Sequence, residues 1–255
     1  MNTIQTKRIL KKKKRITSLL NSISKIDETT IKFIGNKNDN LFKIIRNSLE
    51  DALSRNTDLE DWILNMDGLS GRKYRILINQ LIKRIKDPRY LEIGSWLGST
   101  ACSASFKNKI VMTCIDNWSE NFLPKINPKK EFMKNIKDSL TSNSEFNMIN
   151  KDFRKVDFNE LKNFNIYFYD GSHTYNDHYD AVKLVLPAMS KKFIMIIDDW
   201  NWNQVREATL NAIKDKKLKV IAQLEIKTTN DGSSSIIVSQ NSDWHQGCIF
   251  FVIEK

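Results

Sequence analysis

The sequence predicts an α/β protein built on a mostly parallel β-sheet with helices on both faces. After Pro88, short apolar runs alternate with stretches of helical periodicity, a pattern typical of parallel sheets covered on both sides. Four of these runs end in an acidic residue, alone or followed by a glycine. Because such sheets bind ligands beyond the carboxyl ends of their strands, we expect a functional site at that edge.

The chain has 255 residues, of which 40% are apolar and 28% charged, enough for one large domain or one domain with an extension. No apolar run approaches the roughly 20 residues of a membrane-spanning helix. The basic N-terminus lacks the apolar core of a secretory signal. The three cysteines are far apart and form no CxxC pair, so we expect reduced core thiols in a cytoplasmic protein.

The formal net charge is +11, and much of it is local. Residues 7–15, KRILKKKKR, carry seven positive charges, without which the net charge falls from +11 to +4. Two interpretations stay open. The stretch is either a solvated basic tail or an arm that contacts a polyanion or an anionic membrane.

Helical periodicity dominates the first part of the chain. Apolar residues recur at helical spacing within a basic arm over residues 1 to about 30, and again over 41–55 and 72–86. We therefore divide the chain into a basic helical N-terminal extension, residues 1–60, and an α/β domain, residues 61–255.

The later elements follow from apolar runs and the spacing between them. The runs predict strands at 89–94, 109–116, 146–150, 165–170 and 193–199, with later candidates at 219–226, 234–239 and 248–254. The intervening helical patterns cover 98–106, 128–140, 176–186 and 203–215.

The stretch YLEIGSWLGST, residues 90–100, reads as a strand, a glycine turn and a helix start. Gly94 lets the chain turn sharply and a ligand approach the backbone, and Gly98 lets the helix pack closely on the strand. Free N–H groups near Ser99 favour an anionic group such as a carboxylate. Trp96 occupies a position often taken by glycine, so this is not the GxGxxG loop of a dinucleotide fold.

The second strand ends at Asp116, 24 residues after Glu92. An acid at this place can accept hydrogen bonds from a ribose diol. The chain has no GxxxxGK loop for a triphosphate. A ligand with a ribose and a carboxylate, such as S-adenosylmethionine (SAM), fits these features.

The fourth strand ends in YDGSHTY, residues 169–175, with Asp170 and His173 three residues apart. A sheet interior does not hold an unpaired carboxylate cheaply, so this sequence indicates either a tight turn or a working site.

Four stretches in order resemble class I SAM-dependent methyltransferases, and more narrowly the small bacterial branch called methyltransferase family 24, related to metal-dependent O-methyltransferases. They are LEIGSWLGST, CIDNW, YDGSHTYNDHYDAVKLVLP and FIMIIDDW, within about residues 68–210. The resemblance implies a Rossmann-like, doubly wound, mostly parallel seven-stranded sheet. The first 60 residues show no such resemblance.

The resemblance also assigns residues to the cofactor. The loop after the first strand would cradle the methionine part of SAM, Asp116 the ribose and Asp152 the adenine, although Asp152 can equally begin a surface turn. The implied cofactor-binding residues are Glu92, Gly94, Ser95, Gly98, Ser99, Asp116, Asp152 and Asp170.

Metal and proton chemistry are implied at the ends of the fourth and fifth strands. Asp170, Asp198 and Asp199 match carboxylates that hold a divalent ion in related enzymes, and hard oxygen ligands suit Mg²⁺. Asp198 and Asp199 reach one ion only if the strand has ended by Asp199, because consecutive strand residues point to opposite faces. Alternatively, one acid binds SAM and the other caps the next helix.

His173, acting with Asp170, is the candidate catalytic base, since an imidazole with a pKa of about 6.5 can remove a hydroxyl proton near neutral pH. The alternative is a turn histidine bonded to backbone. Aromatic residues Tyr175, Trp200 and Trp202 would wall the acceptor site, with the loop 68–71 nearby.

The function expected from these features is methylation of a hydroxyl on a small molecule, such as a sugar, glycan precursor or secondary metabolite, with assistance from Mg²⁺. One alternative is an RNA ribose methyltransferase that uses the basic arm; nucleic acid is the less favoured partner, because the chain lacks the motifs of amino-group and cytosine-C5 methylases. The other is a non-catalytic SAM-binding protein. A homo-oligomer stays open.

Overall fold

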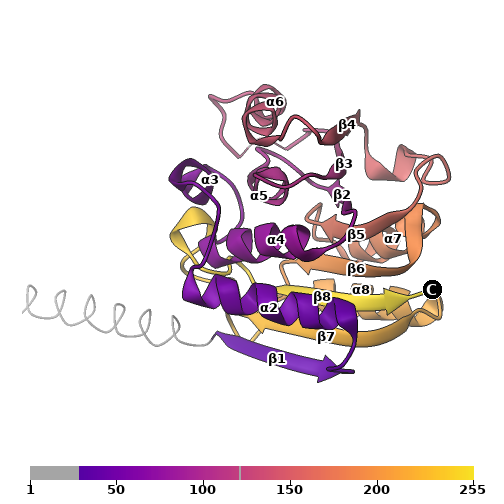
Figure 1. The fold of residues 1–255 in the computed structure, drawn as a ribbon. Helices are drawn as coiled ribbons and strands as arrows, with labels where there is room; N and C mark the ends of the chain where they lie inside the picture. Colours follow the sequence, from indigo (N-terminus) through magenta and orange to yellow (C-terminus); the bar gives the residue numbers. More distant parts are fainter. Residues whose placement is uncertain (1–28, 121) are drawn as a thin grey trace, which may run out of the picture.

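The computed structural model describes residues 29–120 and 122–255, which fold around one β-sheet (Figure 1). The sheet has the strand order β1-β7-β8-β6-β5-β2-β3-β4. The strands are β1 (Thr30–Gly35), β2 (Arg89–Ile93), β3 (Val111–Asp116), β4 (Glu145–Asn150), β5 (Phe164–Tyr169), β6 (Met189–Asp198), β7 (Lys219–Lys227) and β8 (Cys248–Glu254). Strands β4, β3, β2, β5 and β6 run parallel, and β8, β7 and β1 add antiparallel pairs.

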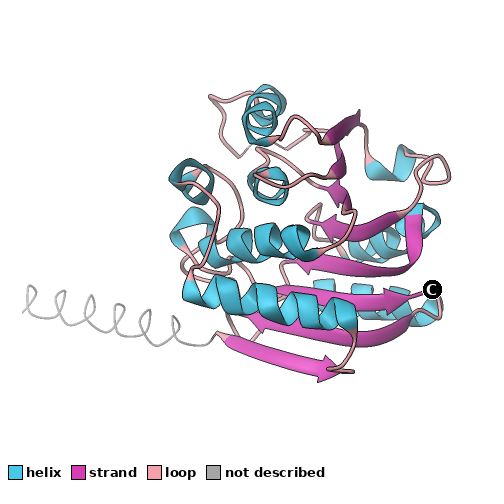
Figure 2. Ribbon diagram, in the orientation of Figure 1, coloured by secondary structure: helices cyan, strands magenta, loops and turns pink. Residues whose placement is uncertain are grey.

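Helices cover both faces of the sheet, as the alternating pattern predicts (Figure 2). One face packs against α2 (Asn40–Ser54), α4 (Arg72–Arg84), α5 (Ser99–Ser105) and α6 (Pro128–Ser139). The other face packs against α7 (Tyr175–Val185) and α8 (Asn203–Asp215). Short helical segments are α3 (Asp61–Asn65), η1 (Phe153–Lys155), η2 (Leu186–Ala188) and η3 (Ser239–Asn241).

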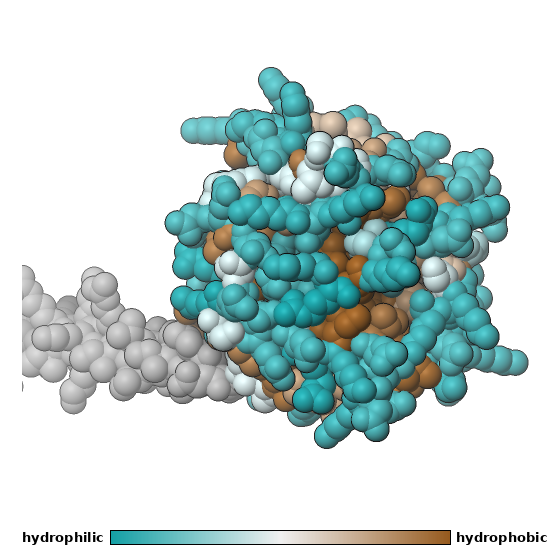
Figure 3. Space-filling view, in the orientation of Figure 1, coloured by the Kyte–Doolittle hydropathy of each residue, from teal (hydrophilic) through white to brown (hydrophobic). Residues whose placement is uncertain are grey.

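Two apolar clusters, one on each side of the sheet, form the core. Alternation along the strands sends Phe168 to the α4 side and Tyr169 to the α7 side. Both side chains are fully buried. Outside, the face seen in Figure 3 is mainly hydrophilic, with apolar side chains showing between polar ones.

The register of the parallel strands determines where the site forms. Ile93 of β2 pairs with Ile115 of β3 and with Tyr169 of β5, and Tyr169 pairs with Ile197 of β6. The carboxyl ends of these four strands therefore lie side by side at one edge of the sheet. The predicted fold class is confirmed.

The predicted strand count is wrong, because the sheet has eight strands rather than seven. The additional strand, β1, pairs antiparallel with β7, from Thr30 opposite Lys227 to Gly35 opposite Ala222. It lies within the span predicted to be a helical extension. A six-residue edge strand leaves only a short sequence signal, and four of its residues are exposed.

The predicted division at residue 60 does not coincide with a break in packing. Helix α2 packs against α4, and Phe33 of β1 contacts Phe42 of α2 with ring centroids 6.0 Å apart. Residues 30–54 are thus integrated with the sheet. The basic arm predicted over the first 30 residues lies almost entirely outside the described residues.

The candidate strand at 234–239 is also wrong: this segment belongs to the loop between β7 and β8. Ile236 and Ile237 are 51% and 40% exposed, and the Ser235 N–H donates to the Gln246 side chain instead of to a neighbouring strand. Helix α3 was not predicted, since five residues carry little periodicity. Within the described ranges, no helix is long and apolar enough to cross a membrane.

The turn after β2 generates a prediction. Gly94 has φ +88°, and a Cβ placed there would lie 1.9 Å from the backbone oxygen of Asp170. We expect Gly94→Ala to lower the free energy of unfolding by about 3 kcal/mol or more, measured by urea denaturation.

The control is Gly232→Ala, because Gly232 has a similar φ of +82° but only the Asn203 side chain nearby, at 3.3 Å. It should lose only about 1 kcal/mol, the effect of the backbone conformation alone. Equal losses in the two variants would contradict the close approach at Gly94.

Candidate cofactor and acceptor site

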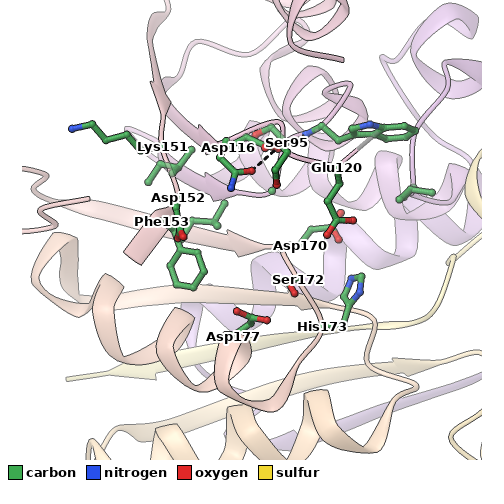
Figure 4. A pocket seen from close by; sticks show the side chains of 18 of the residues that line it. Ser95, Asp116, Glu120, Lys151, Asp152, Phe153, Asp170, Ser172, His173 and Asp177 are labelled. Atoms are coloured by element: carbon green, nitrogen blue, oxygen red, sulfur yellow. Dashed lines mark hydrogen bonds between the residues drawn. The ribbon is translucent and has the colours of Figure 1, made fainter. Parts of the chain in front are cut away.

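A cleft of about 270 Å³ opens at the carboxyl ends of β2, β3, β4 and β5. Figure 4 shows Glu120, Asp170 and His173 on one side of this cleft and Asp152 and Phe153 on another. The predicted site residues on its wall are Gly94, Ser95, Ser99, Asp116, Asp152, Asp170 and His173. Most of the site residues predicted from the sequence therefore lie at one cleft.

Four predicted residues do not line the cleft: Glu92, Gly98, Asp198 and Asp199. Gly98 packs instead against Phe132 of α6, whose ring atom would lie 3.0 Å from an added Cβ. Gly98 also has φ +88°, so it turns the chain into α5 and sets the position of that helix without facing the cleft.

Asp116 is held rigidly at the end of β3. Its Oδ2 accepts a hydrogen bond from the Trp96 N–H at 2.8 Å, and its Oδ1 accepts one from the Trp118 N–H at 2.6 Å. A carboxylate offers about four acceptor positions, so two remain for a ligand diol. Trp118 itself packs on Phe132, with ring centroids 5.4 Å apart, and does not line the cleft.

Glu92 lies directly behind this wall and has no exposed surface. Burial raises the pKa of Glu92 to about 7, although the Tyr90 hydroxyl, which donates to Oε2 at 2.5 Å, stabilises the carboxylate. Glu92 therefore supports the glycine loop from within the protein and does not contact the cleft directly.

Asp152 retains both of its predicted interpretations. Its Oδ1 accepts a hydrogen bond from the Arg154 N–H at 2.9 Å, which caps the short turn η1, and the residue also lines the cleft beside Phe153. Arg154 lies over the Phe153 ring at 4.7 Å and pairs with Asp177 at 2.6 Å. This side of the cleft thus combines an aromatic face with polar edges.

His173 and Asp199 form a close pair beside the cleft. His173 Nε2 lies 2.6 Å from Asp199 Oδ2. Burial opposes protonation of the ring, but the hydrogen bond and negative charge of Asp199 outweigh it and raise the pKa of His173 above its usual value. Since Asp199 occupies Nε2, the Nδ1 atom is the one left for another partner.

The two acids at the end of β6 meet the condition stated for a shared ion, namely that the strand has ended by Asp199. Strand β6 ends at Asp198, and Asp199 follows with φ +56°, in the left-handed region. This turn breaks the strand alternation. Asp198 has 1% exposure, and neither of its carboxylate oxygens has a hydrogen-bond partner.

Ligand atoms of these acids fall into two groups that share Asp199. Those of Asp170, His173 and Asp199 lie within 4.8 Å of one another, and so do those of Asp198, Asp199 and His245. The predicted trio of Asp170, Asp198 and Asp199 is thus divided between two adjoining groups. Burial and the charges of Asp198 and Asp199 raise the pKa of Asp170 well above its usual value.

The histidines outside the motif differ from each other. Burial lowers the pKa of His178 to about 3, and its ring packs edge-on to Tyr169 at 4.8 Å, so this histidine is part of the packing under α7. His245, by contrast, lies beside the reactive acids, with its Nε2 4.0 Å from Asp199 Oδ1. His245 stands in a loop without a motif, so no sequence pattern predicts this contact.

The aromatic residues predicted to wall the acceptor site lie in different places. Trp202 lies next to His173, with ring centroids 4.8 Å apart. Trp200 is buried, and its Nε1–H donates to Glu225, so it does not wall the cleft. In the predicted acceptor loop 68–71, Leu69 lines the cleft.

The buried Glu92 gives a prediction with a definite sign. Its folded-state pKa of about 7 lies above the usual 4.5, so the folded protein binds an extra proton between these values, and stability falls as the pH rises from 4.5 to 7. Glu92→Gln should remove about 3 kcal/mol of this decrease. Urea denaturation of both proteins at several pH values measures it; parallel pH profiles would contradict it.

Comparisons with known proteins agree with this arrangement. Residues 91–200 match the family model described as a methyltransferase domain. No curated protein sequence is significantly similar to the chain.

Three solved structures are among those similar to this chain. A Podospora anserina methyltransferase solved with SAH has TM-score 0.49 and 12% identity, with 94% of this chain and 96% of that one covered. A structure described as a putative SAM-dependent methyltransferase from Streptococcus mutans has TM-score 0.48 and 12% identity, with 72% of this chain and 48% of that one covered. Precorrin-6y C5,15-methyltransferase from Geobacter metallireducens GS-15 has TM-score 0.48 and 12% identity, with 72% of this chain and 87% of that one covered.

The chain spans about half the length of the Streptococcus mutans protein it matches. The identification rests on the family model, together with the strand order and the cleft at the carboxyl edge. Residues 91–200 therefore resemble a methyltransferase domain.

Proposed function

We propose that this protein transfers the methyl group of SAM to a hydroxyl of a small molecule, such as a sugar, a glycan precursor or a secondary metabolite. The observation that carries the proposal is the His173–Asp199 pair, 2.6 Å apart, at the edge of the cleft that also holds Asp116. A histidine oriented by a carboxylate is suited to remove a proton from an acceptor hydroxyl.

The proposed placement of SAM follows the cleft wall. Asp116 would accept hydrogen bonds from the ribose hydroxyls, and the face of Phe153 would lie against the adenine beside Asp152. Gly94 and Ser95 leave room for the methionine part, whose carboxylate would face the backbone N–H groups near Ser99. This placement points the methyl group towards Asp170 and His173.

Methyl transfer from SAM then needs few catalytic groups from the protein. The sulfonium of SAM is already activated, so the main contribution is to align the acceptor oxygen with the methyl group. The neutral His173 ring takes the hydroxyl proton on Nδ1, the nitrogen that Asp199 leaves open. Since the pKa of His173 is raised, the neutral fraction increases with pH, and activity should rise through the neutral range.

The acidic residues fit a divalent cation. Asp170 and Asp198 have raised pKa values because burial and neighbouring acids disfavour their charged forms, and the Asp198 oxygens lack partners. A cation would relieve both effects, and carboxylate oxygens suit Mg²⁺. We therefore include Asp170, Asp198 and Asp199 as residues that would hold Mg²⁺, which when bound would polarise the acceptor oxygen.

The cofactor assignment predicts a loss of affinity in Asp116→Ala. Removing an acceptor of two ribose hydrogen bonds should weaken SAM binding about 10- to 100-fold in isothermal titration calorimetry. Asp138→Ala, at an exposed acid on α6, serves as the control and should bind SAM normally. Unchanged affinity in Asp116→Ala removes the ribose assignment.

The metal assignment predicts that Mg²⁺ stabilises the protein against heat. At a hundredfold excess over the dissociation constant, binding adds about 2.7 kcal/mol, so the melting temperature should rise by several degrees relative to NaCl of equal ionic strength. Asp170→Asn should lose this response, while Asp138→Asn keeps it. If the unsubstituted protein does not respond, the metal proposal is wrong.

The reaction itself is tested with methyl-labelled SAM and two acceptor sets, hydroxylated small molecules and bulk RNA. We expect label in a small molecule and none after His173→Asn, with SAM affinity retained. Label in RNA would contradict the proposal and favour the alternative suggested by the basic stretch at residues 7–15.

A further inference from the structure

His245 is a buried histidine fixed in the loop that joins β7 and β8. Its residue exposure is 7%. Its backbone N–H donates to Ser242 Oγ at 3.0 Å, and its carbonyl accepts from Thr228 Oγ1 at 3.1 Å. The backbone φ of +51° is unusual for a residue with a side chain, so these two hydrogen bonds hold a conformation the residue would rarely adopt alone.

The loop is in turn attached to the segment after β6. The Asn201 side chain accepts from the Thr228 N–H at 2.9 Å, and the Asn201 N–H donates to the Gln246 carbonyl at 3.0 Å. On the other side, the Tyr74 N–H at the start of α4 donates to the Asp243 carbonyl at 3.0 Å. The position of the His245 ring is therefore set by the same framework that positions Asp199.

A single hydrogen bond decides which ring nitrogen of His245 carries the proton. The Ser239 N–H donates to Nδ1 at 3.0 Å, so Nδ1 is an acceptor, and the neutral ring carries its proton on Nε2. Burial lowers the pKa of His245, which agrees with a neutral ring. In this tautomer Nε2 has no lone pair for a metal ion, so His245 is a donor and not a ligand.

The second oxygen of Asp199 lies near this donor. Nε2 lies 4.0 Å from Asp199 Oδ1, while His173 contacts Asp199 Oδ2 at 2.6 Å. The 4.0 Å distance exceeds that of a direct hydrogen bond. Asp199 is 3% exposed, however, and in such surroundings, which screen charge weakly, the positive end of a nearby N–H dipole still attracts a carboxylate.

We propose that His245 is a positioning residue whose Nε2–H group, oriented by Ser239, holds the Asp199 carboxylate so that its other oxygen stays on His173. His245 does not touch the cleft and acts on His173 only through Asp199. This inference rests on the proposed role of His173 as the base, because it concerns the residue that fixes the tautomer of that base.

The chain contains three histidines, so ¹⁵N-histidine NMR of the resting protein can report the tautomer of each ring without an acceptor. We expect both His245 and His173 to carry their neutral-state proton on Nε2. A wild-type His245 with its proton on Nδ1 overturns the proposal before any substitution is made.

Two variants then separate the two polar contacts of the His245 ring, the hydrogen bond from Ser239 and the 4.0 Å contact with Asp199. In His245→Gln the amide nitrogen stands near the place of Nε2 and can donate to Asp199. In His245→Asn the amide oxygen stands near the place of Nδ1, so it can accept from Ser239 but does not reach Asp199. Thermal unfolding checks that both variants fold, and calorimetry checks that both still bind SAM.

We expect His245→Gln to keep the His173 tautomer. We expect His245→Asn to lower the ratio of the Nε2–H to the Nδ1–H form of His173 by at most about fivefold, since a polar contact at 4.0 Å contributes no more than one net hydrogen bond. The reverse ranking, or no change in either variant, means that His245 only holds its loop and overturns the proposal. If the wild-type protein does not bind SAM, the proposed function is wrong. The NMR comparison of His245 and His173 can still be made in that case, because it needs no cofactor.

Discussion

The close approach between the turn after β2 and the end of β5 is the constraint on which the site depends. Gly94 lies so near the Asp170 backbone that a methyl group there would overlap the Asp170 carbonyl oxygen, and the Asp170 N–H donates to Ile93 at 2.9 Å. This contact brings the proposed cofactor loop and the first acid of the reactive group to the same edge. Parallel register then places Asp116 beside them, without any long-range charge attraction being needed.

The site is electrostatically unbalanced. Asp170, Asp198 and Asp199 crowd one edge of the sheet, where His173 pairs with Asp199 and the His245 ring lies near Asp198 and Asp199. Burial prevents water from screening them, which is why the pKa values of Asp170 and Asp198 rise. Such an arrangement lowers the stability of the resting protein, and it becomes favourable when a sulfonium or a divalent cation is bound nearby.

Much of this edge could be predicted from sequence because strand ends are local features. The glycine turn at 94, the acid at 116 and the DGSH segment each follow an apolar run, and parallel pairing alone brings such ends together. Glu92 could not be placed in this way. Period-2 alternation sends it to the helix-covered face behind the wall, and only the packing around Tyr90 shows that it is enclosed there.

The sequence could predict neither β1 nor the role of the loop before β8, for a related reason. Both depend on contacts between segments far apart in the chain: β1 pairs with β7, and the loop 228–247 is held by Asn201 and by the start of α4. A polar loop that bonds side chain to backbone has no period for a pattern to detect.

This dependence on distant contacts has a consequence for the reactive pair. Asp199 and His173 both belong to stretches that resemble the family, whereas His245 comes from the loop between β7 and β8. A carboxylate contacted from one side only could rotate about its side-chain torsions, and the ring it orients would follow. Contact from both sides restricts that rotation. The antiparallel hairpin β7–β8, which extends the sheet beyond its parallel part, therefore also contributes to the order of the site it borders.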